Sequence, residues 1–286
     1  MDRLRLLAVL AHPDDESLGF GGVLARYAAE GVETQLVTAT LGQKGRLRGT
    51  PPGGPGHPGP DRMAEMREAE LRAAAQVLGI RELVLLRYMD GELDRVDPRE
   101  AVTRIAAEIR RLKPHVVITF DPLGAYGHPD HIAICQFTTA AAVAAADPAL
   151  ALSAAPHAIA KLYYRAAEAA FLGAYQEAFK RLTSLVDGVE REATPWPRWA
   201  LTTFVETREQ WPTVWKAVTC HDSQIAAYEK LKHLSPEAHE GLWGHQGFYR
   251  AFSTVNGGRA IETDLFEGLR PSPHAHAAPR AGTEEA

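Results

Sequence analysis

Residues 4–16 of the 286-residue chain read LRLLAVLAHPDDE, and residues 115–131 read HVVITFDPLGAYGHPDH. Each stretch begins with a short apolar run and ends in a cluster of histidine and aspartate. A short, continuous apolar run is typical of a strand that is buried on both faces of a parallel sheet. We therefore expect buried strands at Leu4–Leu10 and His115–Phe120, each followed by a polar loop.

Around these two strands, further apolar runs alternate with amphipathic segments, which is the pattern of βαβ units. Asp97 and Pro98 are typical of a helix N-terminus, and they mark the start of a helix that Lys113 and Pro114 end. The pattern predicts an α/β fold with a mostly parallel sheet. Its other expected elements are strands at Thr34–Thr40 and Glu82–Leu86 and helices at Gly22–Glu30, Met63–Leu78 and Asp130–Ala146.

The remaining segments carry weaker signals. Residues 42–62 are crowded with glycine and proline, which predicts a flexible loop that could act as a lid. The C-terminal half suggests additional strands and helices, which we assign to the same single domain, residues 1–270. Residues 271–286 lack apolar periodicity and are expected to form a disordered tail. The additional elements are strands at Ile159–Tyr164 and Thr202–Glu206 and helices at Ala169–Leu182 and Glu209–His221.

Charge and cysteine content limit the classes of partner and the cell compartment that we expect. The formal net charge of -5 argues against a nucleic-acid or anionic-membrane partner, and no apolar run is long enough for a membrane-spanning helix. Cys135 and Cys220 are the two cysteines of the chain and do not form a CxxC pair, which indicates a reducing, cytoplasmic location. The sequence leaves a homo-oligomer open.

The two polar clusters carry the chemistry. Both follow predicted parallel strands, so they should meet at the carboxyl edge of the sheet, where α/β proteins bind ligands. Histidine with aspartate suits one Zn²⁺ per chain, with Fe²⁺ or another divalent metal as alternatives. We expect His12, Asp15 and His131 to be the metal ligands, because a catalytic zinc site needs three protein ligands and an open position for water. Such a metal lowers the pKa of bound water to about 7.

The remaining polar residues of the clusters supply acid–base groups: Asp14 as general base, His128 as oxyanion stabiliser or acid, and Asp130 as the residue that orients His128.

The motifs AHPDDES at residues 11–17 and GHPDH at residues 127–131 resemble those of the PIG-L (LmbE-like) family of N-acetylglucosaminyl de-N-acetylases. The likeness extends from Leu4 to Ala146 and implies a Rossmann-like fold and a zinc hydrolase that acts on small N-acylated amino sugars. It places the family's metal ligands, general base and charge-relay pair on the same residues. It also implies a catalytic role for Tyr126 and substrate contacts for Arg67, Asp90 and His221.

Two other classes of function compete with hydrolysis. A non-catalytic, metal-dependent sugar-binding protein could use the same scaffold, although Asp14 and His128 would then be dispensable. A dinucleotide site is suggested by Gly19, Gly21 and Gly22, but their spacing is not GxGxxG and the preceding acidic residues would repel phosphate. We therefore expect an N-deacetylase in which metal-bound water attacks the amide carbonyl.

Overall fold

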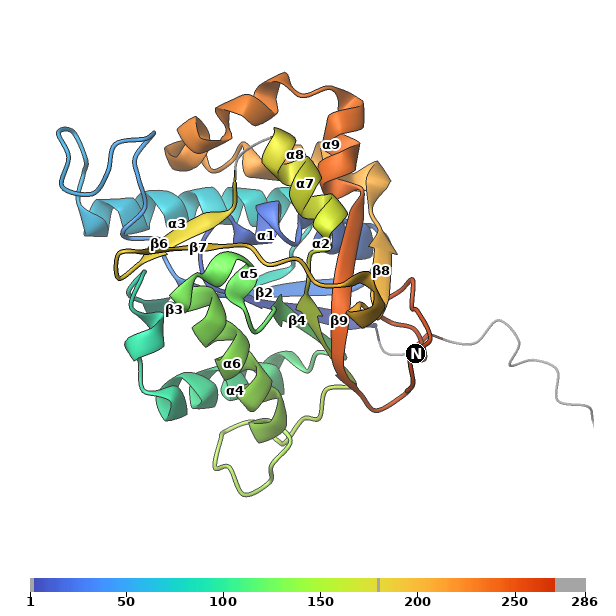
Figure 1. Ribbon diagram of the computed structural model, residues 1–286. Coiled ribbons are helices and arrows are strands. Elements are labelled where there is room, and N and C mark those ends of the chain that lie inside the picture. The colour runs from blue at the N-terminus through green and yellow to red at the C-terminus, as the bar shows by residue number, and fades with distance from the viewer. Residues whose placement is uncertain (1–2, 179–180, 271–286) are drawn as a thin grey trace, which may run out of the picture.

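A seven-stranded sheet forms the centre of the computed structural model, which describes residues 3–178 and 181–270 (Figure 1). The strand order is β3-β2-β1-β4-β5-β9-β8; neighbours from β3 to β5 pair in parallel, and β9 pairs antiparallel with both β5 and β8. The predicted mostly parallel α/β fold is confirmed. The strands of this sheet are β1 (Arg5–Leu10), β2 (Glu33–Thr40), β3 (Glu82–Tyr88), β4 (Val116–Phe120), β5 (Lys161–Arg165), β8 (Thr203–Glu206) and β9 (His245–Ser253).

Helices cover both faces of the sheet, as Figure 1 shows. On one face lie α1 (Asp15–Leu18), α2 (Gly21–Ala29), α3 (Pro60–Val77) and α8 (Trp211–Val218), and on the other α4 (Pro98–Leu112) and α6 (Pro129–Ala144). Because both faces are covered, Leu6 to Leu10 of β1 have no exposed surface. The remaining elements are α5 (Gly124–Gly127), α7 (Ala169–Ala178), α9 (Pro236–Trp243), the hairpin of β6 (Thr183–Val186) and β7 (Val189–Glu192), and short 3₁₀ turns at Leu93–Arg95, Arg198–Ala200, Arg208–Gln210 and Asp222–His233.

The helix signals of the N-terminal half are confirmed. The Asp97 side chain accepts the backbone N–H of Arg99 at 2.9 Å and caps α4, and Lys113 ends the helix in the left-handed conformation, with φ of 52°. Between β2 and α3, the glycine- and proline-rich segment forms neither helix nor strand, apart from one bridge between Leu47 and Thr50.

The C-terminal half differs from the prediction in two places. The helix expected at Ala169–Leu182 ends at Ala178, and the hairpin of β6 and β7 follows. Asp187 and Gly188 form its turn with φ of 49° and 79°, and an Asp-Gly pair is a strong hairpin signal. The sequence also gives no strand signal for β9; this segment is nevertheless a strand of the main sheet, and Phe248 on it is fully buried. The predicted tail lies outside the described residues.

The buried carboxylate of Glu262 binds the segment that follows β9 to residues of the sheet. Glu262 has no exposed surface and accepts hydrogen bonds from Lys161 Nζ at 2.7 Å, Tyr163 OH at 2.7 Å and Thr203 Oγ1 at 2.8 Å. Arg250 Nη1 lies 2.8 Å from the same carboxylate. Removing one partner of such a network leaves the others buried without a counter-charge, so we expect it to stabilise the edge of the sheet.

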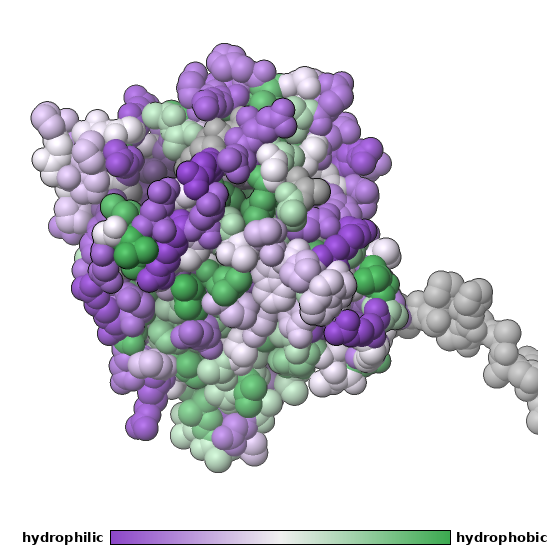
Figure 2. Space-filling view, in the orientation of Figure 1, coloured by the Kyte–Doolittle hydropathy of each residue, from purple (hydrophilic) through white to green (hydrophobic). Residues whose placement is uncertain are grey.

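The surface is of mixed hydropathy (Figure 2). Hydrophilic residues dominate the upper end around α9, and apolar residues gather at the lower end, over the connection between α6 and β5. Val143, near the end of α6, is 69% exposed. Among the described residues, no helix combines the length and the apolar character needed to cross a membrane.

Candidate active site

Three potential metal ligands converge at the carboxyl ends of β1 and β4. His12 Nδ1 lies 3.2 Å from His131 Nε2, and the two oxygens of Asp15 lie 3.5 Å from these nitrogens, one from each. Two imidazole nitrogens and one carboxylate are a typical donor set for a catalytic zinc ion. Burial lowers the pKa of His131 to about 3, so its ring is in the neutral form that binds metal. The donor atoms therefore fit a divalent cation.

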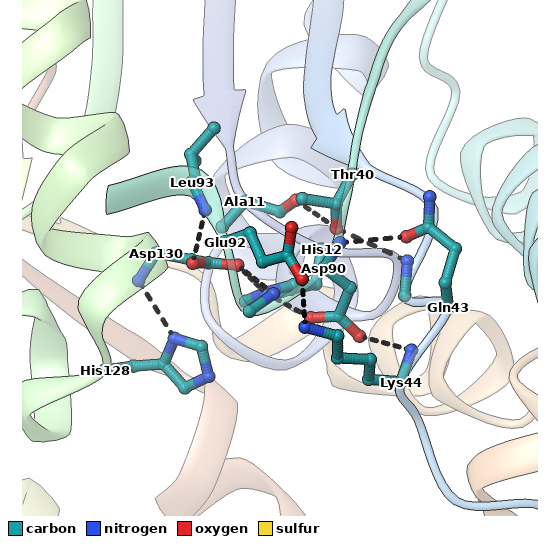
Figure 3. Close-up of polar contacts among 12 residues, drawn as sticks. Ala11, His12, Thr40, Gln43, Lys44, Asp90, Glu92, Leu93, His128 and Asp130 are labelled. Atoms are coloured by element: carbon teal, nitrogen blue, oxygen red, sulfur yellow. Dashed lines mark hydrogen bonds and ion pairs between the residues drawn. The ribbon is translucent and has the colours of Figure 1, made fainter. Parts of the chain in front are cut away.

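The other nitrogen of the His12 ring is held by two carboxylates (Figure 3). His12 Nε2 lies 3.1 Å from Asp130 Oδ2 and 3.2 Å from Asp90 Oδ1. Backbone N–H groups fix both acids: Gly91 and Leu93 donate to Asp130 at 2.7 and 3.0 Å, and Lys44 donates to Asp90 at 3.0 Å. A carboxylate on the second nitrogen fixes the orientation of a metal-binding histidine. His12 can also group with Asp90 and Asp130, or with His128 and His131, around a metal, but His131 and Asp15 face its Nδ1.

The predicted relay between Asp130 and His128 is not what the structure contains. The Asp130 carboxylate points at His12, and its link to His128 is a backbone one: its N–H donates to His128 Nδ1 at 3.2 Å. The cause is local, because His128 caps the N-terminus of α6 and thereby takes the first free N–H group of that helix. His128 is half-buried, and burial, together with the charge of His12, lowers its pKa.

Asp14 lies beside the ligand triad in a left-handed conformation, with φ of 101°. Its Oδ2 accepts hydrogen bonds from Tyr228 OH at 2.7 Å and Arg67 Nη2 at 3.0 Å. Its backbone N–H donates to Glu16 Oε2 at 2.9 Å. Burial raises the pKa of Asp14, and the charge of Arg67 opposes this shift. The carboxylate is thus fixed on one side by two donors, and it borders a cavity on the other.

That cavity has a volume of about 330 Å³ and extends from Asp14, Asp15 and His131 along the carboxyl edge of the sheet. The ring of Tyr126 forms part of its wall, 5.3 Å from that of His131. Most of the opposite wall comes from the C-terminal half of the chain, which the two motifs do not reach. Cavity residues from that half are Arg165, Ala167, Phe171, Leu172, Tyr175, Leu182, Thr183, Thr194, Gln224, Ala227 and Tyr228.

Comparison with known proteins agrees with this geometry. Residues 7–142 match the family described as PIG-L, GlcNAc-PI de-N-acetylase. A 1D-myo-inositol 2-acetamido-2-deoxy-alpha-D-glucopyranoside deacetylase from Kineococcus radiotolerans is 34% identical over 94% of this chain and 84% of its own length. The chain belongs to the PIG-L family. The family predicted from the two motifs is thereby confirmed.

Solved structures extend the likeness in fold. The N,N'-diacetylchitobiose deacetylase from Pyrococcus horikoshii superposes with a TM-score of 0.64 over 87% of this chain and 84% of its own, at 20% identity. GalB, the 4-carboxy-2-hydroxymuconate hydratase from Pseudomonas putida, superposes with a TM-score of 0.66 over 90% of this chain and 100% of its own, at 19% identity. One fold thus supports both a deacetylase and a hydratase, so the reaction must be argued from the site.

The three residues expected to contact substrate are buried and do not line this cavity. Arg67 is 4% exposed and bonds Asp14, and Asp90 is 8% exposed and bonds His12. His221 is fully buried, with Nε2 2.7 Å from Glu16 Oε1. Each of the three thus contacts another polar residue of the site, while Arg67 Nε and His221 Nδ1 have no hydrogen-bond partner among the described residues. Their contacts with substrate stay a prediction.

Sequence reasoning missed several polar residues at the site. Glu16 lies within the first motif, yet it bonds His221 and the Asp14 backbone instead of a metal. Tyr228 lies in a 3₁₀ segment without helical periodicity, so no pattern marks it. Asp121 directly follows β4, and Arg165 is the last residue of β5, so both lie at the same edge of the sheet. Their position at strand ends was a usable signal.

Proposed function

We propose that this protein is a zinc-dependent N-deacetylase that acts on a small molecule containing N-acetylglucosamine. The observation that carries the proposal is the convergence of His12 Nδ1, His131 Nε2 and the Asp15 carboxylate within 3.5 Å, beside Asp14 and at the wall of a cavity. The deacetylase relatives support the reaction class. Zinc itself is supported by the donor set.

A zinc ion bound there would polarise the amide carbonyl and lower the pKa of a water molecule. In the proposed mechanism, Asp14 accepts the proton of the attacking water, because its carboxylate borders the cavity and is fixed by Tyr228 and Arg67. Asp130 and Asp90 keep His12 Nδ1 turned toward Asp15 and His131.

We place the other side of the reacting amide toward Tyr126, which lines the cavity, and His128, whose ring is adjacent to that of His131. Their ring centroids lie 5.9 Å apart, and both lie within 5.3 Å of the His131 ring. In its protonated form, His128 donates a proton to the departing amine, and Tyr126 OH donates a hydrogen bond to the developing oxyanion. The residues around the triad thus supply a base, an acid and an oxyanion donor.

We extend the proposal to the cell compartment and the partner. Cys135 and Cys220 are both free, which suits a reducing cytoplasm. A small amino sugar is the expected partner, because the cavity is of the size that small ligands occupy. The formal net charge of -5 argues against nucleic acid or an anionic membrane as the partner.

The test is release of free amine from a panel of N-acetylglucosaminides by purified protein, before and after removal of metal with a chelator and after zinc restoration. We expect release that the chelator abolishes and zinc restores. The non-catalytic alternative predicts zinc-dependent binding of the same sugars without amine release, and that result would overturn the proposal.

A further inference from the structure

The loop that carries Tyr126, residues 124–127, has a strained backbone. Gly124 and Gly127 have φ of 65° and 75°, and Ala125 has φ of 62° and ψ of -66°. The angles of Ala125 are those of a γ-turn with positive φ at its central residue, which is a rare and strained conformation for a residue with a side chain. Such a conformation persists only where the surrounding structure holds it. The contacts of this loop therefore decide where the Tyr126 ring lies.

On one side the loop is held by Asp121, which directly follows β4 and is 3% exposed. Asp121 Oδ1 accepts the backbone N–H groups of Leu123 at 2.8 Å and Ala125 at 3.3 Å. Both contacts precede Tyr126 in the chain. They fix the start of the loop and leave the carbonyl groups of Tyr126 and Gly127 to other partners.

The hairpin of β6 and β7 supplies those partners. Both strands lie beside α5 (Figure 1). Ser184 Oγ on β6 donates to the Tyr126 carbonyl oxygen at 3.0 Å, and Arg191 Nη1 on β7 donates to the Gly127 carbonyl oxygen at 3.0 Å. The hairpin also packs closely against the loop, since a Cβ on Gly127 would lie 2.8 Å from the Cβ of Arg191. Two consecutive carbonyl groups of the strained loop are thus held by one hairpin.

The same hairpin forms part of the cavity wall. Thr183, the first residue of β6, lines the cavity together with Leu182 and Thr194, which flank the hairpin. Trp196, two residues further on, donates from Nε1 to Asp121 Oδ2 at 3.1 Å. The hairpin segment is therefore joined to both ends of the Tyr126 loop, and it also bounds the space in which substrate would bind.

Ser184 and Arg191 are not among the residues that line this cavity, so any effect they have on the reaction passes through the loop. We propose that Ser184 and Arg191 are positioning residues, which hold Tyr126 at the cavity so that its hydroxyl donates to the oxyanion of the reacting amide. This inference rests on the proposed function, in which Tyr126 is the oxyanion donor. Ser184 is half-buried and Arg191 is exposed. Ser184 therefore contributes more, because water competes with an exposed hydrogen bond.

The first experiment measures amine release by zinc-loaded Ser184→Ala from the N-acetylglucosaminide that the unmodified protein hydrolyses fastest. We expect kcat to fall about tenfold with KM within about twofold, because an oxyanion donor acts mainly in the transition state. Ser184→Thr keeps the hydroxyl and should retain most of the activity. Glu190→Gln is the matched control, because Glu190 is exposed on the same hairpin. An unchanged kcat of Ser184→Ala would overturn the inference while leaving the deacetylase proposal intact.

A double-mutant cycle separates the positioning of Tyr126 from a general effect on the fold. Tyr126→Phe removes the hydroxyl but keeps the backbone carbonyl group that Ser184 holds. Ser184→Ala should therefore lower kcat no further in the Tyr126→Phe background. A further loss of about tenfold there would show that Ser184 does not act through the Tyr126 hydroxyl, and the inference would fail.

The last experiment does not depend on turnover. The protein is labelled with fluorotyrosine, and the fluorine resonance of Tyr126 is assigned as the one missing from Tyr126→Phe. Ser184→Ala should shift or split this resonance, and Glu190→Gln should leave it in place. If this pattern holds but no N-acetylglucosaminide is hydrolysed, the deacetylase proposal fails and the positioning of Tyr126 by the hairpin stands. An unchanged resonance in Ser184→Ala would refute the positioning.

Discussion

Asp130→Asn tests whether the second motif serves the metal through His12 or serves proton transfer through His128. In the structure, the Asp130 carboxylate lies 3.1 Å from His12 Nε2 and is fully buried. Loss of a carboxylate behind a metal-binding histidine lowers metal affinity about 10- to 100-fold, which is roughly 1.4–2.7 kcal/mol. We therefore expect zinc to be bound 10- to 100-fold more weakly by the variant.

The substitution also affects folding. Asp130 accepts the N–H groups of Gly91 and Leu93 as well as His12, and an asparagine NH₂ group replaces one of the two accepting oxygens. A buried N–H left without a partner costs about 1–3 kcal/mol, so the midpoint of thermal unfolding should fall.

Zinc affinity is measured by competition with a chromophoric chelator, with Asp94→Asn as the control because Asp94 is exposed. Turnover is then measured at a zinc concentration that saturates each protein. Most of the lost activity should return at saturation. The reasoning is refuted if the zinc affinity of Asp130→Asn stays within twofold of the unmodified protein while turnover remains low, since that is the behaviour of a relay to His128.

Three further predictions concern the base, acid stability and packing. Asp14→Asn keeps a residue type that tolerates the left-handed conformation, and should retain zinc but lose about 10²–10⁴-fold in kcat; unchanged amine release would refute the base assignment. Burial alone would raise the pKa of Glu262, but hydrogen bonds from Lys161 and its neighbours lower it to about 2. The resulting stability is complete above the unfolded-state pKa near 4.3 and is lost as pH falls toward 2. Glu262→Gln should therefore destabilise the protein by about 3 kcal/mol at pH 7 and by much less near pH 2, as denaturant titrations at both pH values would show. Gly22→Ala would place its Cβ 2.7 Å from Thr207 Oγ1, so we expect a loss of about 1–3 kcal/mol in a denaturant titration; unaltered stability would show that Thr207 moves freely.

The sequence was sufficient for the order of the first strands and helices, because their patterns are local. A buried parallel strand is apolar throughout, and a helix such as that at Pro98–Leu112 carries its capping residue beside it. The same locality predicts that the loops after β1 and β4 meet, since parallel neighbouring strands end at one edge. The sequence alone is therefore enough to group His12, Asp15 and His131.

Only the tertiary structure decided what each polar atom contacts. Asp130 is two residues from His128 in sequence, but the helix that His128 caps turns the Asp130 carboxylate toward His12. Tyr228 and Arg165 reach the site from segments more than 140 residues beyond the first motif. Such contacts depend on how the C-terminal elements pack against the sheet, and packing joins residues whose separation along the chain carries no periodic signal. The sequence by itself therefore determined the sheet edge and the three candidate metal ligands that meet there, while the folded chain determined the direction of each side chain and the wall of the cavity.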